Sequence, residues 1–321
     1  MSKRAKIWLI VAASLMVLGL IIYGAGIVLM DGDLSKLGTA KYETNTHMLH
    51  GEIRDIHVEI DTADIRLLFA EDGVGRVECY EATNANHSVT VEEGTLVLRL
   101  VDERKWYEYI GVNIDSPKIT VYLPRAEYGA LSVEGSTGSV TLPKTICFET
   151  INIAVGTGGV TCLSSASESI RIKASTGRIR VKDVQTEALV LSTSTGLVSV
   201  SSVVCGGDLN IRVNTGLTVV HNVSCKKLIS VGDTGDMSLN HVIAAEKFSI
   251  ERSTGDVELE GSDAAEIFVT TDTGDVKGTL LSEKVFIVQT DTGRVNVPKS
   301  VTGGRCEIST DTGDIKITIV G

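Results

Sequence analysis

A chain of 321 residues is long enough for two ordinary domains, but this one has only 4 Pro and 4% aromatic residues beside 32 Gly. That composition is typical of a β-repeat protein and argues against an ordinary enzyme. The formal net charge is −11, and residues 31–321 alone hold 27 Lys and Arg against 41 Asp and Glu, a net charge of −14. This charge argues against nucleic acid and anionic lipid as partners and favours cations or basic surfaces.

Residues 7–30 are 24 consecutive uncharged and mostly apolar positions. An α-helix needs about 20 such residues to cross a bilayer core, so this segment is predicted to span a membrane. Lys3, Arg4 and Lys6 precede it, and the positive-inside rule then places residues 1–6 in the cytoplasm and residues 31–321 outside the cell. A cleaved signal peptide is the alternative, but its apolar region usually has about 7–15 residues and no clear A-x-A site follows here. We expect a single-pass cell-membrane protein with an uncleaved anchor.

Two less regular segments follow the predicted helix. Residues 31–48 are polar and show no sustained apolar period, which predicts a short stalk. Residues 49–130 are predicted to form an irregular β meander, because apolar residues alternate with polar ones at 57–60, 65–67, 76–79, 88–91, 96–100 and 118–123. Within it, Asp61-Thr62-Ala63-Asp64 is similar to a corner motif that recurs later in the chain, so the meander is expected to begin as a degenerate, capping turn of the same repeat.

A tripeptide of Ser, Asp, Asn or Gly followed by Thr-Gly occurs ten times, all within residues 131–321, at intervals of 19 or 20 residues. Such a period is typical of stacked repeats. Apolar residues recur seven and five positions before the glycines and two and four positions after them, with polar residues between them and gaps at Thr218, Ser230 and Gly278. This period of two predicts a half-buried strand on each side of a corner. The corner glycines are Gly138, Gly158, Gly177, Gly196, Gly216, Gly235, Gly255, Gly274, Gly293 and Gly313.

The predicted fold class is therefore all-β, a single-stranded β-helix or solenoid of about ten rungs behind an N-terminal transmembrane helix. An apolar residue recurring seven positions after the glycine predicts a third short face, and the length variation falls between that face and the next strand, where we expect loops. A right-handed coil is expected because parallel crossovers usually have that hand.

The corner motif Asp-Thr-Gly is also a signature of aspartic proteases, whose two aspartates share a proton. We reject that reading because a protease dyad needs two facing loops, whereas a solenoid stacks its copies along one edge. Asp is also replaced by Ser, Asn or Gly in other copies. With no nucleophile triad, phosphate loop or dinucleotide fingerprint, we predict no catalytic residue, no cofactor and no enzyme activity.

The same corners are a candidate calcium edge, because carboxylates of adjacent rungs would lie about 5 Å apart. Against this, the early rungs lack these carboxylates, Arg294 interrupts the column, and turn capping by Asp explains the residues without a metal. The candidate calcium ligands are Asp233, Asp236, Asp272, Asp275, Asp311 and Asp314.

Three smaller features were considered as sites. Cys205 and Cys225 each follow a corner glycine by nine residues and should be neighbours, either as a disulfide or as two buried thiols. His221 and His241 share nearly the same phase of adjacent rungs but lack a third ligand. The aromatic cluster outside the predicted helix is either a contact patch or part of a cap packed on the first rung. It comprises Trp106, Tyr107 and Tyr109.

The exported region resembles a bacterial family of β-strand-repeat proteins of unknown function, labelled putative adhesins. The resemblance rests on the strand Lys118-Ile-Thr-Val-Tyr-Leu-Pro124, on the following Leu131-Ser-Val-Glu-Gly-Ser-Thr-Gly-Ser-Val140, and on the serial Thr-Gly corners. The N-terminal anchor and short stalk look similar as well. The resemblance implies a single-stranded β-helix at a bacterial cell surface, and it brings no established activity.

Two roles follow as hypotheses. The first is a non-enzymatic adhesin-like or envelope-scaffold module whose long faces bind an envelope polymer or protein. The second is an envelope-stress sensor that acts through a membrane partner, because six cytoplasmic residues cannot signal alone. A surface glycan hydrolase is a third hypothesis and would need paired carboxylates in a cleft. We also expect self-association or partner docking at an open C-terminal edge, because the chain ends at Ile319-Val320-Gly321 without a polar cap.

Overall fold

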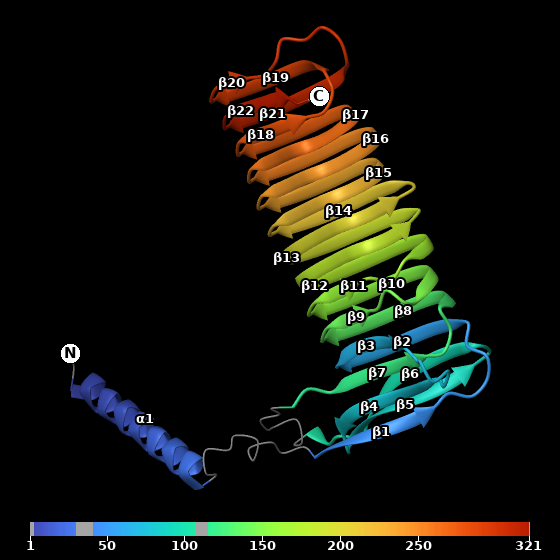
Figure 1. Cartoon of the computed structure of the whole chain (residues 1–321). Helices are drawn as coiled ribbons and strands as arrows, with labels where there is room; N and C mark the ends of the chain where they lie inside the picture. Colours follow the sequence, from blue (N-terminus) through green and yellow to red (C-terminus); the bar gives the residue numbers. More distant parts are fainter. Residues whose placement is uncertain (1–2, 30–40, 107–114, 321) are drawn as a thin grey trace.

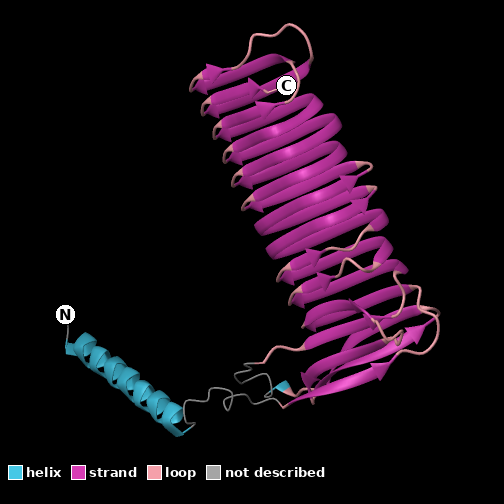
Figure 2. Cartoon of the chain, viewed as in Figure 1, coloured by secondary structure: helices cyan, strands magenta, loops and turns pink. Residues whose placement is uncertain are grey.

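A computed structural model describes residues 3–29, 41–106 and 115–320. It contains one helix, α1 (Lys3–Leu29), and 22 strands in the described residues. The strands form one continuous ladder that stacks into an elongated solenoid (Figures 1 and 2). Within α1, residues 3–26 have a mean hydropathy of 2.4 and none of this stretch is buried in the structure, so it has the length and apolarity of a membrane span or a signal sequence.

The central rungs are stacked parallel and in register. Corner aligns with corner, as where Gly177 of β12 pairs with Gly196 of β13. The strands of this part are β8 (Glu127–Thr137), β9 (Val140–Leu142), β10 (Cys147–Thr157), β11 (Val160–Cys162), β12 (Ala166–Thr186), β13 (Ala188–Cys205), β14 (Asp208–Thr215), β15 (Thr218–Thr234), β16 (Met237–Thr254) and β17 (Val257–Thr273).

The interior of the solenoid is filled by the apolar columns that the period of two predicts. In the rung of β13, for example, Leu189, Leu191, Val198 and Val200 are all fully buried. Burying side chains of this size contributes about 1.5–3 kcal/mol each relative to leaving them exposed. Because every rung offers the same columns to its neighbours, the core is continuous along the rod.

The rungs turn at a glycine corner, and five of them turn again at a second corner of different backbone conformation. At the first, the ten repeat glycines have φ between 130° and 158°, and a Cβ would overlap backbone of the neighbouring rung. At the second, six residues after the glycine, φ lies between 52° and 55° at a column of Asp183, Ser202, Asn222, His241 and Gly261. The length variation is absorbed further on, where the register shifts between Cys225 and Lys227 and between Ala244 and Lys247, as the repeat lengths predicted.

The N-terminal end is built from a displaced rung and an antiparallel layer. β2 (Asp55–Thr62) and β3 (Asp64–Phe69) form a rung on which β8 and β9 stack, with Thr62 opposite Thr137. Ala63 accordingly occupies the corner-glycine position, since a Cβ on Gly138 would overlap its carbonyl oxygen. The expectation that residues 61–64 are a degenerate copy of the corner is confirmed.

The remaining cap strands close this end. β6 (Thr95–Asp102) pairs in parallel with β2, and β7 (Lys118–Leu123) pairs in parallel with β3. β5 (Ala85–Glu92) then pairs antiparallel with β6, while β4 (Arg76–Ala82) pairs antiparallel with β7 and with β1 (Tyr42–Met48). Residues 42–48, which the sequence analysis placed in the stalk, are therefore strand, because β1 supplies the hydrogen-bond partner of β4.

At the C-terminal end the rungs do not stack in chain order. The strands there are β18 (Val276–Leu280), β19 (Lys284–Thr292), β20 (Val295–Asn296), β21 (Gly304–Thr312) and β22 (Ile315–Ile319). β21 and β22 lie between the rung of β17 and β18 on one side and β19 and β20 on the other (Figure 1). The expectation that the last rung in sequence forms the end of the stack is therefore wrong, because β19 and β20 form that end. They cover β21 and only the first two residues of β22, so residues 317–319 pair with β18 alone. Self-association or partner docking at this edge stays a prediction.

Candidate functional site

A groove of about 1240 Å³ runs along the early rungs. It lies where the third face of each rung leads into the next strand, and it is lined by the beginnings of β8, β10 and β12 with the segments before β2 and β6. Its floor is apolar and buried, with Tyr128 at 5%, Phe148 at 3% and Ala166 at 2% exposure. The ring centroids of Tyr128 and Phe148 lie 6.1 Å apart, so the floor contains an aromatic pair formed by two adjacent rungs.

Charged side chains form the rim of this groove. Glu52 pairs with Arg125 at 2.9 Å, and Arg54 pairs with Asp55 at 2.7 Å. Asp55 also accepts a hydrogen bond from the amide of Ala130 at 2.7 Å. Its carboxylate fits there because residue 129 is glycine, since a Cβ at this position would overlap Oδ1 of Asp55. The Asp55 carboxyl is partly buried, which opposes ionisation, but the Ala130 amide and the Arg54 guanidinium bind its charged form and hold its pKa below the usual value.

The groove is acidic overall. Two arginines, Arg54 and Arg125, face five glutamates along its lining: Glu52, Glu93, Glu127, Glu149 and Glu187. The sequence pattern indicates carboxylates mainly at the corners and did not predict this set. A signal was present, because Glu149 and Glu187 each precede the corner glycine of their rung by nine residues. Without the fold, nothing showed that this phase opens onto a groove.

A smaller hollow of about 530 Å³ lies near the other end of the rod. Its wall contains Lys284, which is 2% exposed and pairs with Asp263 at 2.7 Å. The ammonium therefore already has its counter-charge inside the protein, and the hollow offers fewer charged groups than the groove. We take the groove as the candidate functional site.

The corner aspartates act on the backbone. Oδ1 of Asp236 accepts the amide of Asp256 in the next rung at 2.9 Å, and the same bond recurs from Asp275 to Asp256, from Asp314 to Asp275 and from Arg294 to Asp314. The amide of Arg294, together with its guanidinium, lowers the pKa of Asp314. Among the described residues these carboxylates form no group of three ligand atoms within 4.8 Å. The calcium edge over Asp233, Asp236, Asp272, Asp275, Asp311 and Asp314 stays a prediction, and the hydrogen bonds support its turn-capping alternative.

The other sequence candidates have these positions. Cys205 and Cys225 are buried free thiols. The rings of His221 and His241 lie 6.2 Å apart, and both contact the side-chain oxygen of Asn240. Trp106 is 76% exposed; Tyr107 and Tyr109 lie outside the described residues, so the aromatic contact patch stays a prediction.

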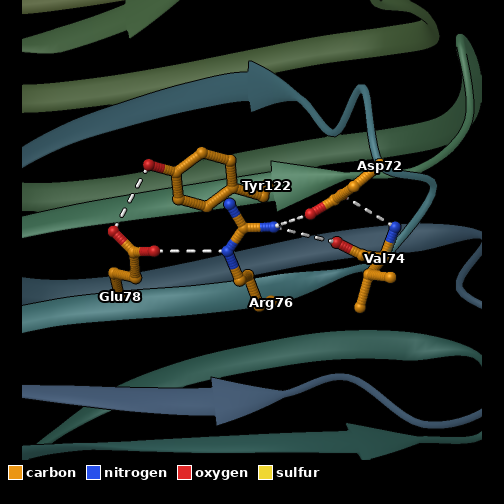
Figure 3. Close-up of polar contacts among 5 residues, drawn as sticks. All are labelled: Asp72, Val74, Arg76, Glu78 and Tyr122. Atoms are coloured by element: carbon orange, nitrogen blue, oxygen red, sulfur yellow. Dashed lines mark hydrogen bonds and ion pairs between the residues drawn. The ribbon is translucent and has the colours of Figure 1, made fainter.

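A further polar network braces the outer face of the cap (Figure 3). Arg76 of β4 donates to Asp72 at 2.9 Å and to Glu78 at 3.2 Å, and its guanidinium lies 3.9 Å from the ring centroid of Tyr122 on β7. Tyr122 in turn donates to Glu78 at 3.3 Å. The network therefore ties β4 to β7.

The fold, the serial glycine corners and the capped N-terminal end agree with a known family of bacterial proteins. The model of the Toastrack family DUF4097 matches residues 53–216 and 206–321. The chain belongs to the Toastrack family. No curated protein matches it.

Several solved structures are similar to this Toastrack chain. A putative lipid binding protein from Parabacteroides distasonis aligns with a TM-score of 0.50 and 18% identity over 75% of this chain and 98% of its own. A putative adhesin from Bacteroides fragilis aligns with a TM-score of 0.34 and 16% identity over 87% and 97%, respectively. One from Parabacteroides merdae has a TM-score of 0.33 and 9% identity over 88% and 98%. At 18% identity, the likeness to the first of these structures concerns architecture alone.

Proposed function

We propose that this Toastrack chain is a non-enzymatic recognition module of the bacterial cell surface, and that the acidic groove is its binding site. The observation that carries the proposal is the groove itself, a hollow of about 1240 Å³ with an aromatic floor and a charged rim on an otherwise regular rod. Concave sites with apolar floors and a few placed polar groups are where proteins usually bind ligands.

The location follows from α1. Its apolar stretch is long enough to cross a bilayer, and Lys3, Arg4 and Lys6 at its start favour a cytoplasmic N-terminus. The solenoid would then stand outside the membrane with its groove open to the envelope. The adhesin label on similar structures accords with this placement.

The chemistry of the groove selects its partner. Glu93, Glu127, Glu149 and Glu187 line it, whereas the two arginines of the lining, Arg54 and Arg125, are paired with Asp55 and Glu52. We infer a protein segment that carries basic side chains beside an apolar or aromatic one, which would pair with the rim and pack on the floor.

Crosslinking and capture from intact cells test this proposal. The full-length protein is compared with a charge-reversed groove variant, Glu127→Lys, Glu149→Lys and Glu187→Lys, and with a matched control, Glu134→Lys, Glu251→Lys and Glu258→Lys, whose glutamates are equally exposed but lie away from the groove. We expect the groove variant alone to lose its partner. Equal capture by all three proteins would refute the groove as the binding site.

The same capture separates the two roles. If the partner is a wall polymer or surface protein that is bound with and without envelope stress, the adhesin-like or scaffold role is supported. A membrane protein captured only under stress would instead support the sensor role, in which the solenoid detects a ligand and the partner transmits the signal.

A further inference from the structure

The N-terminal end of the solenoid core is closed by polar side chains that the proposed function does not use. In the antiparallel pair of β1 and β4, Asn45 lies opposite Cys79 and His47 opposite Val77, so these side chains share one face. That face is the inner one, because Val77 and Cys79 are fully buried and Glu81 is 1% exposed. Ligand atoms of His47, Cys79 and Glu81 all lie within 4.8 Å of one another.

One nitrogen atom of this cluster lacks a hydrogen-bond partner among the described residues. This atom is Nε2 of His47, and it is buried. Leaving a buried polar atom without a partner costs about 1–3 kcal/mol. An imidazole nitrogen that faces a thiol and a carboxylate is satisfied by a cation that all three can share.

The carboxylate is held in place by a second layer of residues. Oε2 of Glu81 accepts the backbone amide of His87 at 2.6 Å and lies 2.6 Å from Nδ1 of the same residue, while Oε1 accepts Nδ2 of Asn45 at 2.8 Å. A carboxylate has about four lone-pair sites, so one remains on Oε1. His87 is itself 4% exposed. Oriented ligands of this kind are typical of metal sites.

We propose that His47, Cys79 and Glu81 bind a zinc ion. Nitrogen, sulfur and carboxylate oxygen are the ligands that zinc takes, whereas calcium and magnesium require oxygen ligands throughout. Ligands bound to a tetrahedral zinc ion at about 2.0–2.3 Å lie roughly 3.3–3.8 Å apart, so side-chain movements of about 1 Å would close the site. On binding, the ion replaces the thiol proton of Cys79, which passes to solvent, and a water completes the fourth position.

The position of the site gives it a structural role. Zinc would join His47 of β1 to Cys79 and Glu81 of β4, and β1 is the first strand after the membrane helix. The ion would thereby fasten the membrane-proximal strand to the solenoid. This role does not depend on the acidic groove, so the two proposals stand or fall separately.

The test is metal binding by the full-length protein, purified in detergent and stripped with a chelator, in a Cys147→Ser background that removes the exposed thiol. Cobalt and then zinc are titrated. We expect one ion per chain, a thiolate-to-cobalt charge-transfer band that zinc abolishes, and a higher thermal midpoint with zinc. A protein that binds no stoichiometric cobalt, or binds it without the thiolate band, would overturn the proposal.

Variants assign the ligands. Cys79→Ser and His47→Asn should abolish the charge-transfer band or weaken binding severely, and Asn45→Ala should weaken it about 10–100-fold by releasing Glu81. Cys306→Ser and His221→Asn are the matched controls, one a fully buried thiol and one an exposed imidazole far along the rod. Wild-type affinity in both His47→Asn and Asn45→Ala would refute the site. This test does not depend on the folding of Cys79→Ser, because His47 and Asn45 lie on an edge strand.

Discussion

One buried charged residue, Arg252, interrupts the apolar pattern of the solenoid core and accounts for two polar positions in it. Arg252 is 4% exposed, and its Nη2 donates to Ser230 at 2.8 Å and to Thr218 at 3.3 Å. Gly232 makes room for the guanidinium, because a Cβ there would overlap Nη1. Nε and Nη1 have no partner among the described residues, and burial lowers the pKa of Arg252. The polar positions 218 and 230, which interrupt their columns, therefore accommodate this one side chain.

This arrangement predicts how stability responds at position 252. Replacing a buried charge by an apolar side chain of similar size is often neutral or stabilising, so Arg252→Met should leave the thermal midpoint unchanged or raise it. Ser230→Ala removes an acceptor and should cost about 1–3 kcal/mol. In the double variant this cost should largely disappear, because no guanidinium remains to be satisfied. Thermal and denaturant unfolding measure all three, and a strong loss in Arg252→Met alone would contradict the prediction.

At the scale of the rung, the corner depends on close backbone approach as much as on turn conformation. Gly158 has φ 147°, and a Cβ there would overlap the carbonyl oxygen of Gly138 in the rung below. The amide of Gly158 meanwhile donates to the carbonyl of Thr176 in the rung above at 2.9 Å. Each corner glycine is thus fixed by its neighbours along the stack, whereas the residue before the Thr-Gly pair varies freely.

Two adjacent glycines allow a matched test of the corner. Gly158→Ala should lower the free energy of unfolding by about 1–3 kcal/mol from backbone strain, with a further loss from the overlap. Gly159→Ala should change it by less than about 0.5 kcal/mol, because a Cβ there would meet its nearest atom at an ordinary 3.7 Å. Thermal unfolding of the two variants is the measurement. Similar midpoints would show that the corner tolerates a side chain.

At the scale of the whole molecule, both ends of the rod place one rung out of chain order. The rung of β2 and β3 lies between β6 with β7 and β8 with β9, and the rung of β21 and β22 lies between β17 with β18 and β19 with β20. At the C-terminal end, the chain therefore forms the outermost rung, β19 with β20, before it forms the rung beneath, β21 with β22. The terminal strand β22 is paired on both sides only at Ile315 and Lys316, and its remaining residues pair with β18 alone.

Engineered disulfides test the stacking order at this end. Ser309 pairs with Thr270 on one side and with Gln289 on the other, so each pair should lie about 4.8 Å apart, whereas Thr270 and Gln289 should be about 9.6 Å apart. A disulfide requires Cα atoms within about 7 Å. Under mild oxidation Thr270→Cys with Ser309→Cys and Gln289→Cys with Ser309→Cys should crosslink, and Thr270→Cys with Gln289→Cys should not. Preferential crosslinking of the third pair would show instead that the rungs stack in chain order.

The sequence by itself determined the repeat, the strands on either side of each corner, the membrane-length helix and the family, because each depends on local periodicity that a solenoid copies in every rung. Even the degenerate corner at Ala63 could be recognised from residues 61–64. The alternation of apolar and polar residues also placed the core columns without reference to the fold.

Only the tertiary structure decided which rung lies beside which. The rungs with corners at Gly293 and Gly313 carry nearly the same motif, so by sequence either could pack on the rung of Gly274. Only the strand pairing shows that the rung of Gly313 takes this position. The acidic groove and the cluster of His47, Cys79 and Glu81 were likewise not predictable. Their members come from strands whose separation in sequence, such as 47 to 79, has no fixed period, and only the antiparallel pairing of the cap brings them together.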